Sequence, residues 1–407
     1  MESHYDVVII GAGPAGAVAG TKLIKDGWSV LVLEKMEFPR FVIGESLLPK
    51  CMNYLEELDL LDAVKEQAFQ VKTGVTFYHE DKICEFLFSQ RFTEGWDYTY
   101  QVKRADFDLA LINEAEKKGV NVEFNTEVTD VQTSKIEQIV TCRDANGIEH
   151  QIRSRFVVDA SGYGRVLPKM FNLEKPAISI PRGSIFAHIN DSKRTENASD
   201  NIFVHAFRNN TAWIWSIPFS DGTASVGIVG EIDFINECDE NSGEKFKGLV
   251  KTFPGLEERF SDMEFAFEPK KILNYSISVE KMYGDGFVLC GNSTEFLDPV
   301  FSSGVTLAIG SGYQAAELVS KQLKGEQVDW EKDYVAFMEH GIEVFRSYVD
   351  GWYSGDLHKI FFAENGNPEF KKQICSVLAG YVWDKTNPFV KKHKTILPTL
   401  AKVITMN

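Results

Sequence analysis

The sequence predicts a mixed α/β protein with two domains, and three observations support this fold class. Residues 4–16 have the pattern of an apolar strand, a glycine-rich turn and the start of a helix. Residues 180–280 carry mostly strand signals separated by turns. The strand and glycine pattern returns at residues 286–291 and leads into a helical pattern. Together these patterns predict a Rossmann-type dinucleotide-binding domain with an inserted antiparallel β-sheet substrate domain and a C-terminal helical segment.

The string GAGPAG at residues 11–16 has the spacing of a dinucleotide-binding turn. Gly11 permits the tight turn, Gly13 lets the backbone approach a pyrophosphate, and Gly16 lets the helix and strand pack closely. The next apolar strand ends at Glu34, about 20 residues beyond the glycines, where a ribose hydroxyl is usually accepted. An acidic residue at this position argues against a 2′-phosphate on the nucleotide. The candidate cofactor-binding residues in this unit are Gly11, Gly13, Ala15, Gly16, Glu34 and Lys35.

The remaining elements follow from hydrophobic periodicity and turn residues. Strands and helices are expected to alternate up to about residue 45, and further helices are expected from there through 66, over 101–118, over 305–323 and through 331–405. Strands are expected over 70–77, 83–88, 121–124, 202–207, 213–218 and 224–229, and strands alternating with turns over 127–158. A discontinuous nucleotide-binding domain is therefore expected at 1–75, 100–170 and 281–330, a β-rich substrate domain at 76–99 and 171–280, and a helical region at 331–407.

Length, charge and cysteine content favour a cytoplasmic enzyme. The 407 residues, 44% of them hydrophobic, allow a large core, and the net charge of −16 disfavours nucleic acid and anionic membranes as partners. We find neither a signal peptide nor an apolar run of about 18 residues, so we expect no membrane span. The six cysteines are scattered without a C-x-x-C pair, which predicts neither a metal site nor a redox dithiol. The basic residues at 391–394 are expected to form a solvated face.

The string WIWSIP at residues 213–218 is the most specific feature of the chain. Because side chains alternate along a strand, Trp213, Trp215 and Ile217 should share one face and form a bulky, water-poor wall. An ordinary hydrophobic sheet face explains this string about equally well if it is considered alone.

With the nucleotide-binding turn and the tryptophan string, further motifs resemble the flavin-dependent halogenases, within the FAD monooxygenases of the p-hydroxybenzoate hydroxylase fold. These motifs are GES at residues 44–46, R-x-x-F-D at 104–108 and DASG at 159–162. The resemblance covers most of the chain and implies an FAD-dependent oxidoreductase, either a halogenase or a monooxygenase. It extends the expected FAD contacts to Arg40, Glu45, Ser46, Arg104, Gly291, Asn292, Pro299, Gly304 and Val305.

Lys72 lies in a K-x-G segment that is similar to the one presenting the active-site lysine of these halogenases. The resemblance implies a catalytic role for Lys72, together with Trp213 and Trp215. An ammonium group can polarise hypohalous acid, and a desolvated amine can take the halogen onto nitrogen. An ordinary exposed strand lysine is the alternative interpretation.

The string FLDPVFSSG at residues 296–304 resembles the F-x-x-P-x-x-S-x-G signature of the family. It implies that backbone N–H groups of Ser303 and Gly304, at a helix start, hold a halide. A flavin-binding turn without halide is the alternative. Asn292 stands where the wider fold usually has an aspartate for the ribityl chain, and Asp298 is a candidate to share that role. Phe301 stands where tryptophan halogenases have a glutamate, which disfavours free tryptophan as the substrate.

The resemblance implies that reduced FAD and O2 form a C4a-hydroperoxide, which oxidises chloride or bromide to hypohalous acid. The expected substrate is an electron-rich aromatic, of phenol or pyrrole type, possibly bound to a carrier protein. We find no second nucleotide-binding motif, so a separate flavin reductase is expected to supply reduced FAD.

Three alternatives remain at this point. An aromatic hydroxylase would transfer oxygen directly to its substrate. A reductase similar to geranylgeranyl reductase would act on isoprenoid double bonds, although Lys72 would then have no explained role. An inert flavin-binding or polyketide-binding protein would bind a ligand without catalysis.

Overall fold

An eight-stranded sheet carries the glycine-rich turn. The computed structural model describes residues 3–176, 180–194, 200–240 and 243–406. The main path of the sheet has the order β18-β19-β10-β1-β2-β7, and β9, which pairs with β8, is added along β10. The strands are β1 (His4–Ile10), β2 (Val30–Leu33), β7 (Asn121–Glu123), β8 (Glu127–Gln132), β9 (Gln138–Arg143), β10 (Glu149–Asp159), β18 (Tyr283–Gly284) and β19 (Phe287–Leu289). Strands β19, β10, β1, β2 and β7 pair in parallel, as a Rossmann-type sheet requires.

The first crossover explains two of the glycines in the turn. Helix α1 (Pro14–Lys25) starts directly after the turn that follows β1. Gly11 has φ +100°, and a Cβ there would lie 2.6 Å from the carbonyl oxygen of Ala160, while a Cβ on Gly16 would overlap the carbonyl oxygen of Gly11. Only glycine allows this approach between the first turn and the chain after β10.

Helices pack around this sheet and connect its strands. Helix α1 packs against α8 and α4, and α2 packs against α8. The bounds are α2 (Lys50–Glu57), α3 (Leu61–Lys65), α4 (Arg104–Lys117), α5 (Val166–Met170) and α8 (Ser303–Leu323). The prediction that the last of these begins at Val305 is wrong by two residues, because Ser303 and Gly304 already belong to its first turn.

The second sheet has seven strands in the order β16-β12-β15-β14-β13-β4-β5. All neighbours are antiparallel except β13 and β4. The strands are β4 (Gly74–His79), β5 (Lys82–Leu87), β12 (Arg182–Asn190), β13 (Ile202–Phe207), β14 (Ala212–Pro218), β15 (Thr223–Glu231) and β16 (Lys270–Leu273). One face packs under α6 (Ile232–Cys238) and α7 (Glu244–Val250), two short helices that the strand-rich pattern did not predict.

The segment expected to form one strand over residues 70–77 is split at Thr73. Strand β3 (Gln70–Lys72) pairs with β6 (Thr99–Gln101) in a separate two-stranded sheet, whereas β4 belongs to the seven-stranded sheet. The backbone N–H of Thr73 donates to Asn201 Oδ1 at 3.0 Å instead of continuing a ladder. A further short pair joins β11 (Glu174–Pro176) to β17 (Ile277–Val279).

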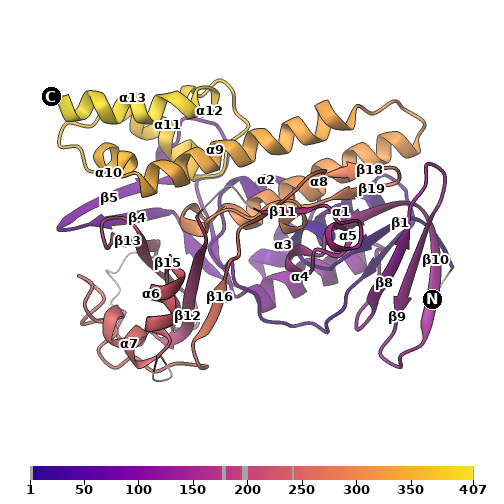
Figure 1. Cartoon of the computed structure of the whole chain (residues 1–407), viewed down its shortest axis with the longest axis horizontal. Coiled ribbons are helices and arrows are strands. Elements are labelled where there is room, and N and C mark those ends of the chain that lie inside the picture. The colour runs from indigo at the N-terminus through magenta and orange to yellow at the C-terminus, as the bar shows by residue number, and fades with distance from the viewer. Residues whose placement is uncertain (1–2, 177–179, 195–199, 241–242, 407) are drawn as a thin grey trace.

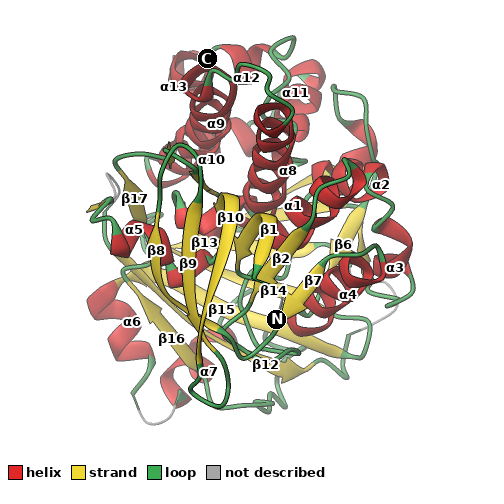
Figure 2. Cartoon of the chain, turned by 90° about the vertical axis from the view of Figure 1, so that its right-hand side faces the viewer, coloured by secondary structure: helices red, strands yellow, loops and turns green. Residues whose placement is uncertain are grey.

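The C-terminal helices lie across the top of both sheets, as Figures 1 and 2 show. They are α9 (Ala336–Tyr353), α10 (Asp356–Phe361), α11 (Pro368–Leu378), α12 (Pro388–Lys391) and α13 (His393–Met406). Tyr348 and Trp352 of α9 are fully buried, and Trp352 packs on Phe77 of β4 with ring centroids 5.4 Å apart. These aromatic residues therefore hold α9 on the second sheet.

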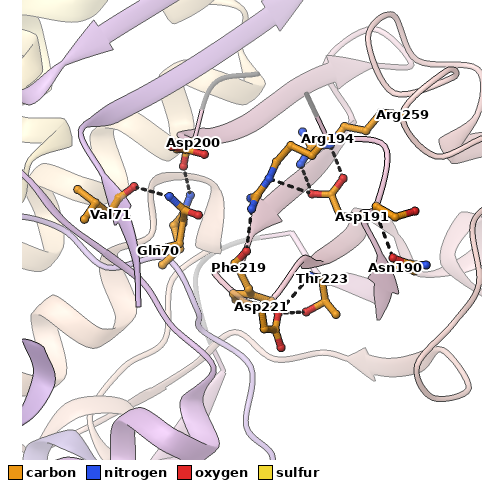
Figure 3. Close-up of polar contacts among 12 residues, drawn as sticks. Gln70, Val71, Asn190, Asp191, Arg194, Asp200, Phe219, Asp221, Thr223 and Arg259 are labelled. Atoms are coloured by element: carbon orange, nitrogen blue, oxygen red, sulfur yellow. Dashed lines mark hydrogen bonds and ion pairs between the residues drawn. The ribbon is translucent and has the colours of Figure 1, made fainter. Parts of the chain in front are cut away.

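A buried ion pair fixes the far end of β12. Asp191, only 2% exposed, accepts hydrogen bonds from Nε and Nη2 of Arg259 at 2.7 and 2.5 Å (Figure 3). Arg194 donates to the carbonyl oxygen of Phe219 at 3.0 Å. The loops at this end of the sheet are thus tied together away from the glycine-rich turn.

The glycine requirement at the first turn can be tested by substitution. Gly11→Ala combines a positive φ with a backbone clash, so we expect it to lower the free energy of unfolding by about 3 kcal/mol. Gly27→Ala is the matched control, because Gly27 has φ +93° but no atom within 4 Å of the added methyl group, and about 1 kcal/mol is expected. Urea titration of both variants measures the difference, and equal losses would show that the clash is not the cause.

Candidate functional site

A cavity of about 640 Å³ lies between the glycine-rich turn, the start of α8 and the tryptophan face of β14. This volume falls in the range of ligand sites that hold cofactors. Most of the predicted site residues line it: Gly11, Gly13, Ala15, Glu34, Lys35, Arg40, Glu45, Ser46, Arg104, Trp213, Trp215, Gly291, Asn292, Pro299, Gly304 and Val305. Gly16, Lys72 and Ser303 are absent from its lining, as far as the described residues go.

Glu34 is fixed at the nucleotide end of the cavity. One carboxylate oxygen accepts from the N–H of Ala12 at 2.8 Å and the other from the N–H of Met36 at 2.9 Å. Each oxygen keeps a free lone pair, so the carboxylate can still accept ribose hydroxyl groups. No atom lies closer than 3.5 Å to a Cβ built on Gly13, which leaves the start of α1 open to a phosphate.

Two arginines share one buried carboxylate on the cavity wall. Asp108 is fully buried and accepts from Arg104 at 2.7 and 2.9 Å and from Arg40 at 3.0 Å. Only Nη1 of Arg40 donates to Asp108, and its Nη2 lies 3.5 Å from a Cβ built on Gly13, where it can also bind a pyrophosphate. The arginines come from segments that are about 60 residues apart in the sequence, and Asp108 holds them together.

The tryptophan wall is present as expected. Trp213, Trp215 and Ile217 are all buried and line the cavity, whereas Ile214 packs in the core on the opposite face of the sheet. The two indole rings have centroids 5.6 Å apart. Gly227 lies opposite Trp215 in the ladder, and any side chain there would occupy the space of the indole ring. The requirement for this glycine could not be recognised from the sequence without the strand register.

Lys72 is buried behind the cavity wall. It is 1% exposed, its Nζ donates to the carbonyl oxygen of Leu47 at 2.8 Å, and it lies 5.4 Å from the centre of the Phe88 ring. Burial lowers the pKa of Lys72 to about 7, so a substantial fraction of the amine is neutral near that pH. Cys51, four residues after Leu47, has its Sγ 3.1 Å from Thr306 Oγ1 in the first turn of α8. The lysine is therefore close to the start of α8 but does not face the cavity.

The candidate halide turn begins at Asp298. Its side chain accepts from the N–H of Val300 at 3.2 Å and caps a short 3-10 turn, Pro299–Phe301. Ser302 then takes φ +56°, and α8 starts at Ser303. The first N–H groups of this 21-residue helix have no partner within the helix, so they can bind an anion or a polar flavin edge. Asp298 is also bound by tyrosine hydroxyl groups and is absent from the cavity lining among the described residues, and its role toward the ribityl chain stays a prediction.

Two unpaired polar atoms in the cavity wall are available as hydrogen-bond partners for a cofactor. Glu45 Oε1 is 2.5 Å from His188 Nε2, whereas Glu45 Oε2 and Ser46 Oγ are buried and have no hydrogen-bond partner among the described residues. Buried polar atoms are rarely left unpaired, so the two atoms mark places for ligand groups. The lining and these atoms fit FAD. His188 was not predicted, because no motif in the sequence indicates its pairing with Glu45.

Comparisons with known proteins agree with this site. Residues 4–334 match a family model described as an FAD binding domain. The chain is 31% identical over 387 residues to a 1H-pyrrole-2-carbonyl-[peptidyl-carrier protein] brominase of Pseudoalteromonas luteoviolacea, covering 93% of each chain. It is 29% identical to the corresponding chlorinase of Pseudomonas fluorescens, covering 94% of this chain and 91% of that one. A crystal structure of a flavoprotein/dehydrogenase from Cytophaga hutchinsonii superposes with TM-score 0.96, at 51% identity and 99% coverage of both chains.

The described parts of the chain hold neither a membrane-spanning helix nor a cluster of metal ligands. None of their helices is both long and apolar enough to cross a bilayer. Their histidine, cysteine and acidic side chains form no group of three or more that could hold a metal ion.

The carboxylate at the nucleotide end can be tested by binding. Glu34→Ala removes the expected ribose acceptor and the partner of the Ala12 N–H, so we expect FAD to bind about tenfold more weakly. Fluorescence titration of the apoprotein with FAD measures this, with the exposed Glu37→Ala as the control. Unchanged affinity in Glu34→Ala would exclude this contact.

The buried lysine should make stability depend on pH. The pKa of Lys72 is about 7 in the folded protein and 10.5 ordinarily, so the unfolded chain binds the proton more tightly between these values. The resulting penalty on folding is full below about pH 7 and disappears as the pH rises toward 10.5. Lys72→Met should therefore stabilise the protein more near pH 6 than near pH 10, as measured by urea unfolding. Exposed Lys82→Met is the control, and a gain that does not vary with pH would contradict this explanation.

Proposed function

The chain belongs to the FAD-binding domain family, in its flavin-dependent halogenase branch, and from this membership we propose that it halogenates an electron-rich aromatic ring. It is an FAD-dependent oxidoreductase. The observation that carries the proposal is the wall of Trp213, Trp215 and Ile217 across the cofactor cavity. A substrate kept behind this wall cannot receive oxygen directly, whereas a small oxidised halogen species can travel to it.

The chemistry supplied by bound reduced FAD is the activation of O2, so that FADH2, O2, a halide ion and a proton give FAD, hypohalous acid and water. The N–H groups of Ser303 and Gly304 hold the halide at the start of α8, where the helix dipole favours an anion. The buried tryptophans limit the access of water to the product. A separate flavin reductase delivers the reduced cofactor.

Lys72 directs the halogen onto the ring. Its ammonium form can donate a hydrogen bond to hypohalous acid, and its neutral form can take the halogen onto nitrogen and release hydroxide. The pKa of about 7 makes both forms available. Because Nζ is bonded to the carbonyl oxygen of Leu47, it must leave this partner and turn toward the wall before it can react.

The substrate is a pyrrole or phenol ring, presented on a carrier protein. Two relatives are named for pyrrole groups bound to a carrier protein, one as a brominase and one as a chlorinase. Phe301 supports an apolar ring as the substrate, because it packs among Phe77, Tyr348 and Trp352 and offers no charge to an amino acid substrate.

The halide step and the transfer step can be separated. Wild-type protein loaded with reduced FAD and mixed with O2 and bromide should consume a β-diketone trap for hypohalous acid, and should brominate a carrier-bound pyrrole. Lys72→Ala should still consume the trap but lose ring bromination by about 100-fold or more. The trap is followed by absorbance and the product by mass spectrometry.

Lys82→Ala is the control, because it removes an exposed lysine from the neighbouring strand. If bromide has no effect on the trap and the ring gains oxygen, the protein is a hydroxylase. If Lys72→Ala brominates the ring normally, Lys72 is not catalytic.

A further inference from the structure

Three segments of the chain meet at the carboxylate of Asp298, and a fourth is joined to them through a tyrosine hydroxyl group. Tyr353 at the end of α9 donates to its Oδ2 at 2.8 Å, and Tyr275 donates to the same oxygen at 3.1 Å. The indole N–H of Trp213 donates to the hydroxyl oxygen of Tyr353 at 3.0 Å. Asp298, Tyr275 and Trp213 are each less than 9% exposed. The wall tryptophan is therefore connected to the halide turn through the hydroxyl group of Tyr353.

The direction of each hydrogen bond is determined by its chemistry. Burial raises the pKa of Asp298, but the nearby Arg182 and the N–H of Val300 favour its ionised form. An ionised carboxylate only accepts, and an indole N–H only donates. Burial raises the pKa of Tyr353 well above its usual value, so the hydroxyl keeps its proton. Tyr353 must then give this proton to Asp298 and turn a lone pair toward Trp213. The carboxylate thus sets the orientation in which the hydroxyl group can accept from the indole.

Arg182 holds the ring of Tyr353 from the other side. Its guanidinium carbon lies 3.5 Å from the centre of the tyrosine ring, and Nη1 donates to the carbonyl oxygen of Thr211 at 2.7 Å. Thr211 directly precedes β14, the strand that carries Trp213. The same strand is therefore attached to the end of α9 at two points.

Asp298 also holds the turn that leads into α8. Its Oδ1 accepts from the N–H of Val300, and the next residues pass through the positive φ of Ser302. Such a backbone conformation persists only when its surroundings fix it. The carboxylate of Asp298 therefore controls the shape of the turn. Through Tyr353 it also controls the indole of Trp213, which faces the turn across the cavity.

We propose that Asp298 and Tyr353 are positioning residues that hold Trp213 in register with the halide turn, so that the end of α9 controls how tightly the cavity confines hypohalous acid. The proposal rests on the proposed function for the identity of the confined species. Without the Tyr353 hydroxyl, the buried indole N–H has no acceptor and the ring loses its fixed orientation. Tyr275 donates to the same oxygen but does not contact the indole, so it is a control for the position of the indole; unlike Tyr353, it also lines the cavity.

The position of the indole can be observed without catalysis. We expect the FAD-loaded protein labelled with 5-fluorotryptophan to give a single narrow ¹⁹F resonance for Trp213, assigned by its loss in Trp213→Phe. This resonance should shift and broaden in Tyr353→Phe and Asp298→Asn and stay in place in Tyr275→Phe. The affinity for FAD should change by less than about threefold in Tyr353→Phe, because this residue does not line the cavity.

Turnover gives the second measurement. Loss of one hydrogen bond should lower the yield of trapped hypohalous acid per reduced FAD about fivefold in Tyr353→Phe, with a matching rise in free hydrogen peroxide. Tyr275→Phe keeps the acceptor of the indole although its ring lines the cavity, so it should lower the yield less than Tyr353→Phe does. If the two tyrosines only stabilised the fold, both variants would have a lower melting temperature, but the ratio of trapped hypohalous acid to free hydrogen peroxide would not change.

The two proposals fail in different ways. An unchanged Trp213 resonance in Tyr353→Phe would overturn the positioning role, whatever the reaction. A wild-type protein that binds FAD but never consumes the trap would overturn the halogenase function, and the resonance would still decide the positioning role. Should Tyr353→Phe not fold, Asp298→Asn provides the same comparison, because its amide no longer forces the tyrosine hydroxyl to donate.

Discussion

The packing of the tryptophan face of the second sheet against the nucleotide-binding layer is the contact on which the site depends. It places Trp213 and Trp215 opposite the start of α8 and closes the cavity between the two sheets. Large aromatic rings provide much buried area with few rotatable bonds, so they form a wall with a defined shape. The pairing of Glu45 with His188 joins the same two layers at a second point.

Features fixed by neighbouring residues were predictable from the sequence. The glycine-rich turn, Glu34 after β2 and the shared face of Trp213 and Trp215 follow from spacing and strand alternation, and the structure has each of them. Features set by contacts across the fold were not predictable. The break at Thr73 depends on Asn201, and the acceptor of the Trp213 indole lies 140 residues further along the chain. The domain boundaries and the role of each site residue stay predictions.

Lys72 shows how a reactive group and a stable fold compete. Burying a cation is unfavourable, and the hydrogen bond from Lys72 to the carbonyl oxygen of Leu47 compensates only part of this penalty. The same desolvation that opposes folding brings the amine to a pKa of about 7, where it can act as a nucleophile. The position therefore gains reactivity from the environment that destabilises the folded state.

The separation along the chain between Trp213 and its hydrogen-bond acceptor also affects the order in which the site can form during synthesis. At ordinary translation rates, the 140 residues that separate it from Tyr353 take about 7 to 28 seconds to be added. Both sheets are complete in sequence before α9 exists, so they can form on the ribosome while the indole N–H is still unpaired. The indole of Trp213 can thus reach its final arrangement only after α9 has been made, and a nascent chain that binds its cofactor before then holds it against a wall that is not yet fixed.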